Sequence, residues 1–292
     1  MNDIVDVSVV VPHYQDLERL DRCLAALEQQ SMARDRYEII VADNMSACGP
    51  DAVRCLIAGR ARLVLVPERG AGPARNAAVS AARGGVLAFT DADCVPAPDW
   101  LSAGVAALDG SDIVGGSVTL LFEGSGIKSG AEAYEAVFAF NNRRYIEREG
   151  FSVTANLFCR RHVYDVTGPF RVGLSEDKDW CHRASALGFR IAYQPAALVA
   201  HPARLDWPAL LKKWRRLNAE LFANVQARPG GRTRWLLASL AMPLSIIAHL
   251  PRIVGSPALL NRQERQRGAV TLARLRLWRC ADGMLRLMGA RA

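Results

Sequence analysis

Short apolar runs alternate with segments of helical periodicity over the first 90 residues, and this alternation constrains the fold more than any other feature of the chain. Val7 to Val11 (VSVVV) is mostly β-branched and stops at Pro12, which is the pattern of a strand covered on both faces of a parallel sheet. The cycle repeats, with strands expected at 37–42, 63–66 and 86–90 and helices at 16–30, 50–58 and 73–82. This alternation predicts a three-layer α/β sandwich with a mostly parallel sheet.

Charge divides the chain into two parts. Half of its 292 residues are hydrophobic, so a large core is available. Residues 201–292 carry 17 Lys and Arg against 4 Asp and Glu, whereas residues 1–200 carry 20 against 25. We therefore expect a catalytic domain at 1–205 and a basic helical appendage at 206–292.

Beyond residue 100 the alternation is weaker. We expect a polar-faced helix at 127–149, a helix at 176–187 closed by Gly188, and strands at 112–121, 152–158, 189–193 and 197–200.

The seven cysteines include no CxxC pair, which favours a reducing cytosol over a disulfide framework or a zinc site. The first residues lack the basic stretch of a secretory leader, so we expect no leader.

Polar groups follow three of the expected strands, at 12–14, 43–44 and 91–93. In open α/β sheets, ligands bind beyond the carboxyl ends of the strands. If Asp91 and Asp93 lie in an extended segment, both carboxylates point the same way and can hold one Mg²⁺ or Mn²⁺. The alternative is a solvated turn capped by Asp91. The spacing favours neither.

Two further stretches allow a functional or an ordinary interpretation. Gly70, Gly72 and Arg75 (RGAGPAR) suit a phosphate at the start of a helix, although a flexible loop has the same composition. Glu176 and Asp177 open another helix, either as a general base with its neighbour or as an ordinary acidic first turn. His201, just beyond a strand, is either a metal or phosphate ligand or a structural histidine.

Taken in their order along the chain, these stretches resemble the motifs of the family 2 glycosyltransferases, which are inverting enzymes of the GT-A fold. The similarity extends from Val7 to His201 and rests on six segments: VSVVVPHYQD, EIIVADNMS, GPARNAA, FTDADC, TANLFCRRHVYDVTGPF and SEDKDWCHRASALGF. The processive members carry a QxxRW motif, and the comparable region here reads LLKKWRRLNAEL. The resemblance therefore implies transfer of a single sugar.

The resemblance also implies roles for individual residues. Asp177 would be the catalytic base, with Glu176 beside it, and Asp93 would bind the Mg²⁺ or Mn²⁺ that bridges the diphosphate. Asp91 would face the ribose or the sugar and is a further candidate metal ligand, as is His201. The expected donor-binding residues are Pro12, Tyr14, Asp43, Arg75, Asn76, Asp91 and Asp93.

These roles imply a metal-dependent, inverting glycosyltransferase of the hexosyltransferase type. Its expected donor is a nucleotide sugar, most often UDP-linked among relatives, and its expected acceptor is a hydroxyl on a lipid-linked or cell-surface glycan precursor. An alternative is an NAD(P)-dependent oxidoreductase, because Gly70-x-Gly72 precedes Asp91 at about the Rossmann spacing. A nucleic-acid partner is not expected, because apolar stripes interrupt the basic residues of the tail.

The basic tail predicts contact with an anionic membrane. As a helix, Trp235–Leu250 would reach about 24 Å, which is shorter than a hydrocarbon core of about 30 Å, so we expect interfacial or re-entrant insertion. Further on, one helix face is expected to gather apolar residues and the opposite face Arg276, Arg279 and Arg286. The expected apolar set is Val270, Leu277, Trp278, Ala281, Met284, Leu285 and Met288. We therefore expect a cytoplasmic protein that is peripheral to the inner face of the cytoplasmic membrane.

Overall fold

The computed structural model describes residues 5–124, 126–172 and 175–289, and the chain forms two compact units. The expectation of no leader concerned the first residues of the chain, and the first four of these lie outside the described ranges. The first unit runs to Thr119 and includes Phe140–His201; the second combines Leu120–Ala139 with the chain from Pro202 onward. The expected boundary at 205 lies near the start of this C-terminal part, but residues 120–139 were expected in the first domain.

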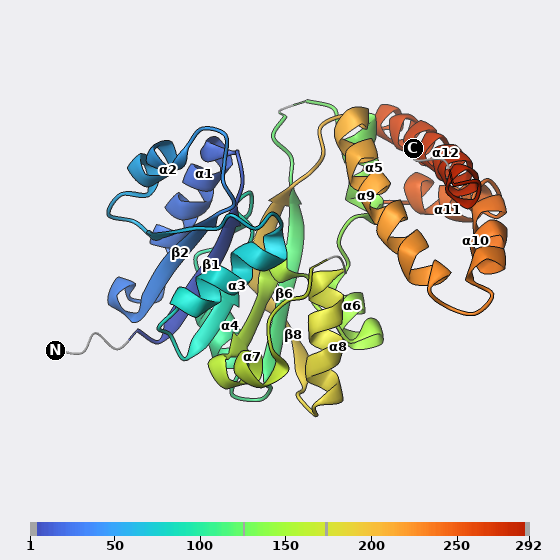
Figure 1. The fold of residues 1–292 in the computed structure, drawn as a ribbon. Coiled ribbons are helices and arrows are strands. Elements are labelled where there is room, and N and C mark those ends of the chain that lie inside the picture. Colours follow the sequence, from blue (N-terminus) through green and yellow to red (C-terminus); the bar gives the residue numbers. More distant parts are fainter. Residues whose placement is uncertain (1–4, 125, 173–174, 290–292) are drawn as a thin grey trace. The chain divides into compact units, whose positions relative to one another are not determined.

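An eight-stranded sheet with the order β3-β2-β1-β4-β7-β6-β8-β5 organises the first unit (Figure 1). The strands β3, β2, β1 and β4 pair parallel with one another, whereas β7 pairs antiparallel with β4 and β6, and β5 pairs antiparallel with β8. The predicted α/β fold is confirmed, with its parallel part in the first four strands. The strands are β1 (Val7–His13), β2 (Tyr37–Asp43), β3 (Arg62–Leu65), β4 (Val86–Phe89), β5 (Val95–Pro96), β6 (Ile113–Leu121), β7 (Leu157–Arg160) and β8 (Ile191–Pro202).

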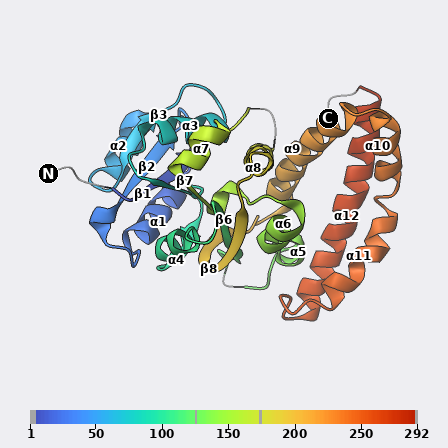
Figure 2. The ribbon, with the colours of Figure 1, turned by 90° about the horizontal axis from the view of Figure 1, so that it is seen from below.

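Helices cover both faces of the sheet, and Figure 2 shows α3 and α7 on one side with α1 and α4 on the other. Along β1, Val9 and Val10 enter different core clusters, because successive side chains of a strand alternate. The cluster of Val9 packs under α1, α2 and α4, and that of Val10 packs under α3, α7 and α8. The helices of this unit are α1 (Leu17–Glu28), α2 (Pro50–Ile57), α3 (Ala71–Ala81), α4 (Trp100–Ala107), α6 (Asn142–Glu149), α7 (Arg161–Thr167) and α8 (Glu176–Ala186).

Four of the expected elements are wrong in their extent. The helix expected at 127–149 is two helices, because Ala139 leaves the helical conformation at ψ −138° and the Asn141 side chain caps a new helix start. The strand expected at 152–158 begins only at Leu157, after a 3₁₀ turn at Thr154–Asn156. The two short strands expected at 189–193 and 197–200 are one continuous strand, β8.

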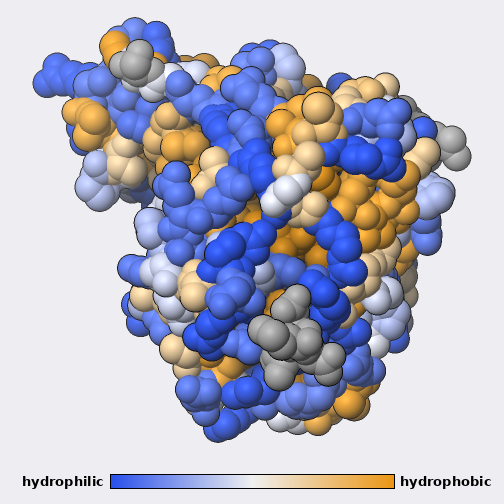
Figure 3. Space-filling model, turned by 90° about the vertical axis from the view of Figure 1, so that its left-hand side faces the viewer, coloured by the Kyte–Doolittle hydropathy of each residue, from blue (hydrophilic) through white to orange (hydrophobic). Residues whose placement is uncertain are grey.

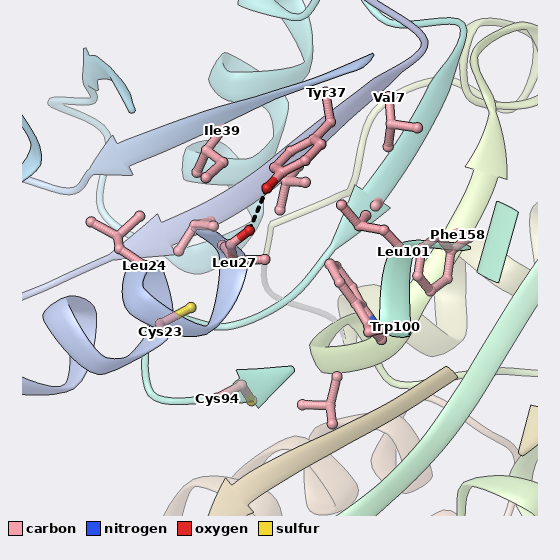
Figure 4. Close-up of a cluster of buried hydrophobic side chains, with 14 of the residues drawn as sticks. Val7, Cys23, Leu24, Leu27, Tyr37, Ile39, Cys94, Trp100, Leu101 and Phe158 are labelled. Carbon is pink, nitrogen blue, oxygen red and sulfur yellow. Dashed lines mark hydrogen bonds between the residues drawn. The ribbon is translucent and has the colours of Figure 1, made fainter. Parts of the chain in front are cut away.

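The aromatic pair Trp100 and Phe158 fills the first cluster, with ring centroids 4.8 Å apart (Figure 4). Gly104 of α4 faces Phe158 so closely that a Cβ would overlap its ring. We expect Gly104→Ala to lower the free energy of unfolding by about 1–3 kcal/mol, because a packed core does not admit the extra methyl group. The control is Gly110→Ala, where nothing lies within 4 Å. Urea unfolding measures both, and equal stabilities would contradict this packing.

The second unit is helical and consists of α5 (Gly130–Phe138), α9 (Trp207–Gln226), α10 (Gly231–Leu240), α11 (Leu244–Val254) and α12 (Arg262–Leu287). Its core joins α5, α9 and α12, and a Cβ at Gly268 of α12 would lie 3.4 Å from that of Ala133 on α5. This close contact explains why residues 120–139 belong with the C-terminal part. Lys213, on the segment compared with QxxRW, lies 2.8 Å from the buried carboxylate of Glu135.

Two arginines of the face expected on α12 make their contacts within the second unit. Arg279 donates to Asn218 at 3.1 Å and covers the Trp214 ring, and Arg286 donates to the buried Asp282 at 2.7 Å. Burial, followed by the charge of Arg276, lowers the pKa of Arg279 to about 10. The apolar side of the helix is the one left exposed, including Val270, Leu277, Leu285 and Met288, whereas Trp278 and Met284 are half-buried.

Within the described residues, no single helix has the length and hydropathy needed to cross a membrane. The pair α10 and α11 reaches those values only jointly, across a bend of 56°. Large hydrophobic side chains are exposed in both units. Figure 3 shows one face of the molecule, on which hydrophobic residues gather in patches bordered by hydrophilic ones.

Candidate functional site

The parallel strands β1, β2 and β4 bring their carboxyl ends to one edge of the sheet. Hydrogen bonds join the loops at this edge: Asn44 N donates to His13 O at 2.9 Å, and Gln15 N donates to Ser46 Oγ at 2.7 Å. The Asn44 side chain donates to the carbonyls of Val66 and Glu68 and accepts from Gly70 N. Asn44 therefore braces the glycine loop against the end of β2.

Asp43 and Tyr14, two of the expected donor-binding residues, differ in exposure. Asp43 is 1% exposed, and its carboxylate lies 2.8 Å from His13 Nδ1 and accepts from the hydroxyl and the backbone N–H of Ser46. Tyr14 is 57% exposed, and Pro12 is half-buried within β1. His13, which lies between Pro12 and Tyr14, was not among the expected site residues. Binding of the donor by Asp43 stays a prediction.

Asp91 and Asp93 lie in a turn, the second of the two expected arrangements, and not in an extended segment, so strand alternation does not align their carboxylates. Cys94 N donates to Asp91 O at 3.0 Å, which closes the turn directly after β4. The two carboxylates consequently have different neighbours. Asp91 Oδ1 accepts from Arg75 at 2.6 Å, whereas Asp93 Oδ2 lies 3.7 Å from His201 Nε2.

Asp93, Cys94 and His201 form a group whose potential ligand atoms lie within 4.8 Å of one another. The sequence predicted Asp93 and His201 but missed Cys94. Burial, with the charges of Asp91 and Asp93, raises the pKa of the Cys94 thiol, and sulfur is a soft ligand that suits a hard cation poorly. A carboxylate and an imidazole suit Mn²⁺ when substrate oxygens complete its coordination. The residues present therefore fit one divalent cation.

Arg75 connects the strand end to the start of α8. Its side chain is 4% exposed and donates to both Asp91 and Glu176. A Cβ at Gly72 would lie 2.9 Å from Glu176 Oε2, so this glycine leaves room for the carboxylate. The positive charge of Arg75 in α3 is thus balanced by two carboxylates of the protein itself. The expected contact of Arg75 with a phosphate stays a prediction.

Asn76 secures the other side of α3. Its amide donates to Phe170 O at 2.9 Å and accepts from the Tyr164 hydroxyl at 2.7 Å and from Phe170 N at 2.9 Å. Both functional atoms of the side chain are thus used in fixing α3 to α7 and the segment after it. Its role in donor binding also stays a prediction.

Asp177 is partly buried in the first turn of α8, next to the Arg75 ion pairs. Burial raises its pKa; the Lys178 backbone N–H, which donates at 2.8 Å, and the Arg75 charge act in the opposite direction. Glu176 and Asp91 also contribute negative charge that raises it. A carboxylate with a raised pKa is a stronger proton acceptor, which is the chemistry of a general base.

The family model of glycosyl transferase family 2 matches residues 8–176, more than half of the chain. The chain belongs to this family. Glycosyltransferase AglE of Haloferax volcanii is 32% identical over 220 residues, which cover 73% of this chain and 71% of AglE. Succinoglycan biosynthesis protein ExoO of Rhizobium meliloti is 29% identical over 216 residues, 68% of this chain and 60% of ExoO.

The fold of this glycosyltransferase is also similar to that of mannosyltransferase PcManGT from Pyrobaculum calidifontis, solved in complex with GDP-Man and Mn²⁺. The TM-score is 0.60 at 20% identity, over 97% of this chain and 88% of PcManGT. The expected GT-A fold and glycosyltransferase activity are confirmed. None of these relatives supports the alternative of an oxidoreductase.

We expect Arg75→Lys to destabilise the glycosyltransferase by about 1–3 kcal/mol and to slow transfer, because a lysine ammonium cannot bond both carboxylates as the guanidinium does. Urea unfolding and initial rates measure the two effects. The matched control is Arg83→Lys, since Arg83 is 59% exposed and pairs with Glu38 at 3.2 Å. If the two variants behave alike, Arg75 does not hold the two acids in place.

Proposed function

We propose that this glycosyltransferase moves one sugar from a nucleoside-diphosphate sugar to an acceptor hydroxyl with inversion at the anomeric carbon. The observation that carries the proposal is that a candidate cation site and a candidate general base both lie near the strand ends. Asp93 and His201 are suited to a cation, while Asp177 lies in the first turn of α8 beside the ion pairs that link Arg75 to Asp91 and Glu176. Inversion needs a single base on the face of the sugar opposite the leaving group, and one such carboxylate is available.

In this proposal Asp93 and His201 hold Mg²⁺ or Mn²⁺, with Asp91 as a neighbouring carboxylate. The bound cation supplies stabilisation of the negative charge that develops on the leaving diphosphate. Asp91 is held by Arg75 at 2.6 Å, which leaves its second oxygen for the ribose or sugar hydroxyls. The complex of PcManGT with Mn²⁺ supports the choice of cation by analogy of fold.

The other residues bind and orient the reactants. Asp177 accepts the proton of the acceptor hydroxyl as it attacks, and Glu176 is fixed beside it by Arg75. Tyr14 and Pro12 line the pocket for the nucleotide. Asp43 contacts His13 and Ser46 and so holds the strand end that forms this pocket. General-base catalysis of this kind contributes about 10²–10⁴-fold to a rate.

The proposed donor is a UDP-sugar, and the proposed acceptor is a lipid-linked or cell-surface glycan precursor. The similarity to ExoO, a succinoglycan biosynthesis protein, supports a glycan acceptor. We also propose that the protein is cytoplasmic and attached peripherally to an anionic membrane through its C-terminal unit. Five arginines and no acidic residue in residues 221–263 support this attachment.

A thermal-shift screen of UDP-, GDP- and dTDP-sugars, with and without Mn²⁺ or Mg²⁺, tests the donor and the cation together. A ligand that binds only the folded protein stabilises it by about 2.7 kcal/mol at a hundred times its Kd. We expect a shift with a UDP-sugar that requires the cation. A shift of the same size in EDTA would overturn the metal-dependent mechanism.

A further inference from the structure

An apolar surface on the second unit is formed by the outer side of α10 and α11. Its large side chains are between 37% and 75% exposed and recur every three or four residues, which places them along one side of the two helices. We call them the elbow face: Leu237, Leu240, Leu244, Ile247, Leu250 and Val254. Scattered exposed leucines are ordinary, whereas a continuous set of this size marks an interaction surface.

The inner side of the same helices is held by α12. The Trp235 indole donates to Gly283 O at 3.0 Å, and Ser239 lies so close to Gly283 that a Cβ there would overlap its hydroxyl. Ile253 is fully buried and lies near Gly268. Because these contacts fix the orientation of both helices, the elbow face is held outward by the packing of the unit.

Charge around the elbow face favours an anionic partner. Arg232 and Arg234 lie at the start of α10, Arg252 lies near the end of α11, and Arg262 begins α12; all four are exposed. No acidic residue occurs between Glu220 and Glu264. An apolar helix face bordered by arginines is the composition of a segment in the headgroup layer of an anionic bilayer, where arginine also pairs with lipid phosphate.

We infer that the elbow face enters one leaflet of an anionic membrane and lies in its headgroup layer. This inference deepens the proposed membrane attachment and rests on it. The ten residues of α10 and eleven of α11 reach about 15 and 16 Å as helices, half of the roughly 30 Å hydrocarbon core. The bend of 56° keeps the two from forming one straight span, so both helices lie shallow.

The test is flotation of the full chain with vesicles of phosphatidylglycerol and phosphatidylcholine in equal parts. We expect Leu244→Glu with Ile247→Glu to lower the ratio of bound to free protein more than tenfold, because two charges replace the two most exposed apolar side chains of the elbow face. The control is Val166→Glu with Leu187→Glu, at positions 60% and 55% exposed in the first unit. Unchanged flotation of the Leu244 and Ile247 variant would overturn the inference.

A second variant keeps the apolar side chains and removes charge. We expect Arg234→Gln with Arg252→Gln to weaken binding to these vesicles by roughly fivefold for each arginine, with no change on pure phosphatidylcholine. Size-exclusion chromatography with light scattering tests the alternative, that the elbow face binds a second copy of the chain. If the Leu244 and Ile247 variant converts a dimer into a monomer and still floats, the elbow face binds a second copy and the membrane inference is wrong.

The same samples separate this inference from the proposed catalysis. The stabilisation by donor and Mn²⁺ is expected to be equal in the wild type and in the Leu244 and Ile247 variant. If neither protein responds to any donor while flotation differs as predicted, the catalytic proposal fails and the membrane surface stands. If both respond to the donor and flotation does not differ, the reverse holds.

Discussion

Replacement of Asp177 by asparagine is expected to slow sugar transfer by about 10²–10⁴-fold, because the amide keeps the shape of the side chain but cannot accept the acceptor proton. Donor binding is expected to persist, since the cation ligands Asp93 and His201 are unchanged. Initial rates and thermal shifts with donor and Mn²⁺ measure the two effects. The control Asp179→Asn changes an acid of the same helix that pairs with Arg183 at 2.8 Å.

The pH dependence provides a second measurement on the same variant. Burial raises the pKa of Asp177 above 3.8, so the folded protein holds this proton more tightly than the unfolded chain does. The stability that Asp177 contributes is therefore complete below its unfolded pKa and is lost as pH rises through the folded pKa. Asp177→Asn should remove that loss in urea unfolding between about pH 3 and 8. A difference between the proteins that is independent of pH would contradict the raised pKa.

Asp93→Asn is expected to abolish the part of the donor-induced thermal shift that depends on Mn²⁺ and to slow transfer by at least about 10²-fold. The reason is that an amide is a weaker ligand for a hard cation than a carboxylate, and one of the two suitable ligands is thereby lost. Thermal shifts across a range of Mn²⁺ concentrations give the apparent affinity for the cation in each protein.

Cys94→Ala serves as the matched control for Asp93→Asn, because Cys94 belongs to the same group of potential ligands but offers a soft sulfur atom. We expect the dependence on Mn²⁺ to survive in Cys94→Ala. If instead Cys94→Ala loses it and Asp93→Asn retains it, the cation is bound through sulfur, and the assignment of Asp93 as the principal ligand is wrong.

Local patterns predicted the first four strands well because each is a short, continuous apolar run bounded by proline, glycine or charge. Prediction failed where a long polar stretch had no strong boundary. Residues 127–149 have helical composition throughout, and only the turn at Ala139 divides them between the two units. Periodicity also separated the apolar and arginine faces of α12, but it could not show that Asn218 and Asp282 pair with the arginines within the unit.

The residues of the candidate site were likewise predicted in part. Motif order indicated Asp93, His201, Glu176 and Asp177, and the structure brings the first two together and places the other two at the start of α8. The role of Arg75 as a link between Asp91 and Glu176 could not be read from spacing, because its partners are 16 and 101 residues away. Cys94 and His13 were missed because a buried thiol and a buried histidine have no distinguishing local pattern.

The sequence by itself determined the layered α/β fold, the family and the identity of the acids near the strand ends, because apolar periodicity and motif order are local properties of the chain. The tertiary structure alone decided which partner each charged group takes. Asp91 pairs with Arg75 while Asp93 faces His201, and two arginines of α12 pair within the second unit while the apolar sides of α10, α11 and α12 remain exposed. The energy of a charge depends on its neighbours in space and on its burial, and both arise only when distant segments pack together.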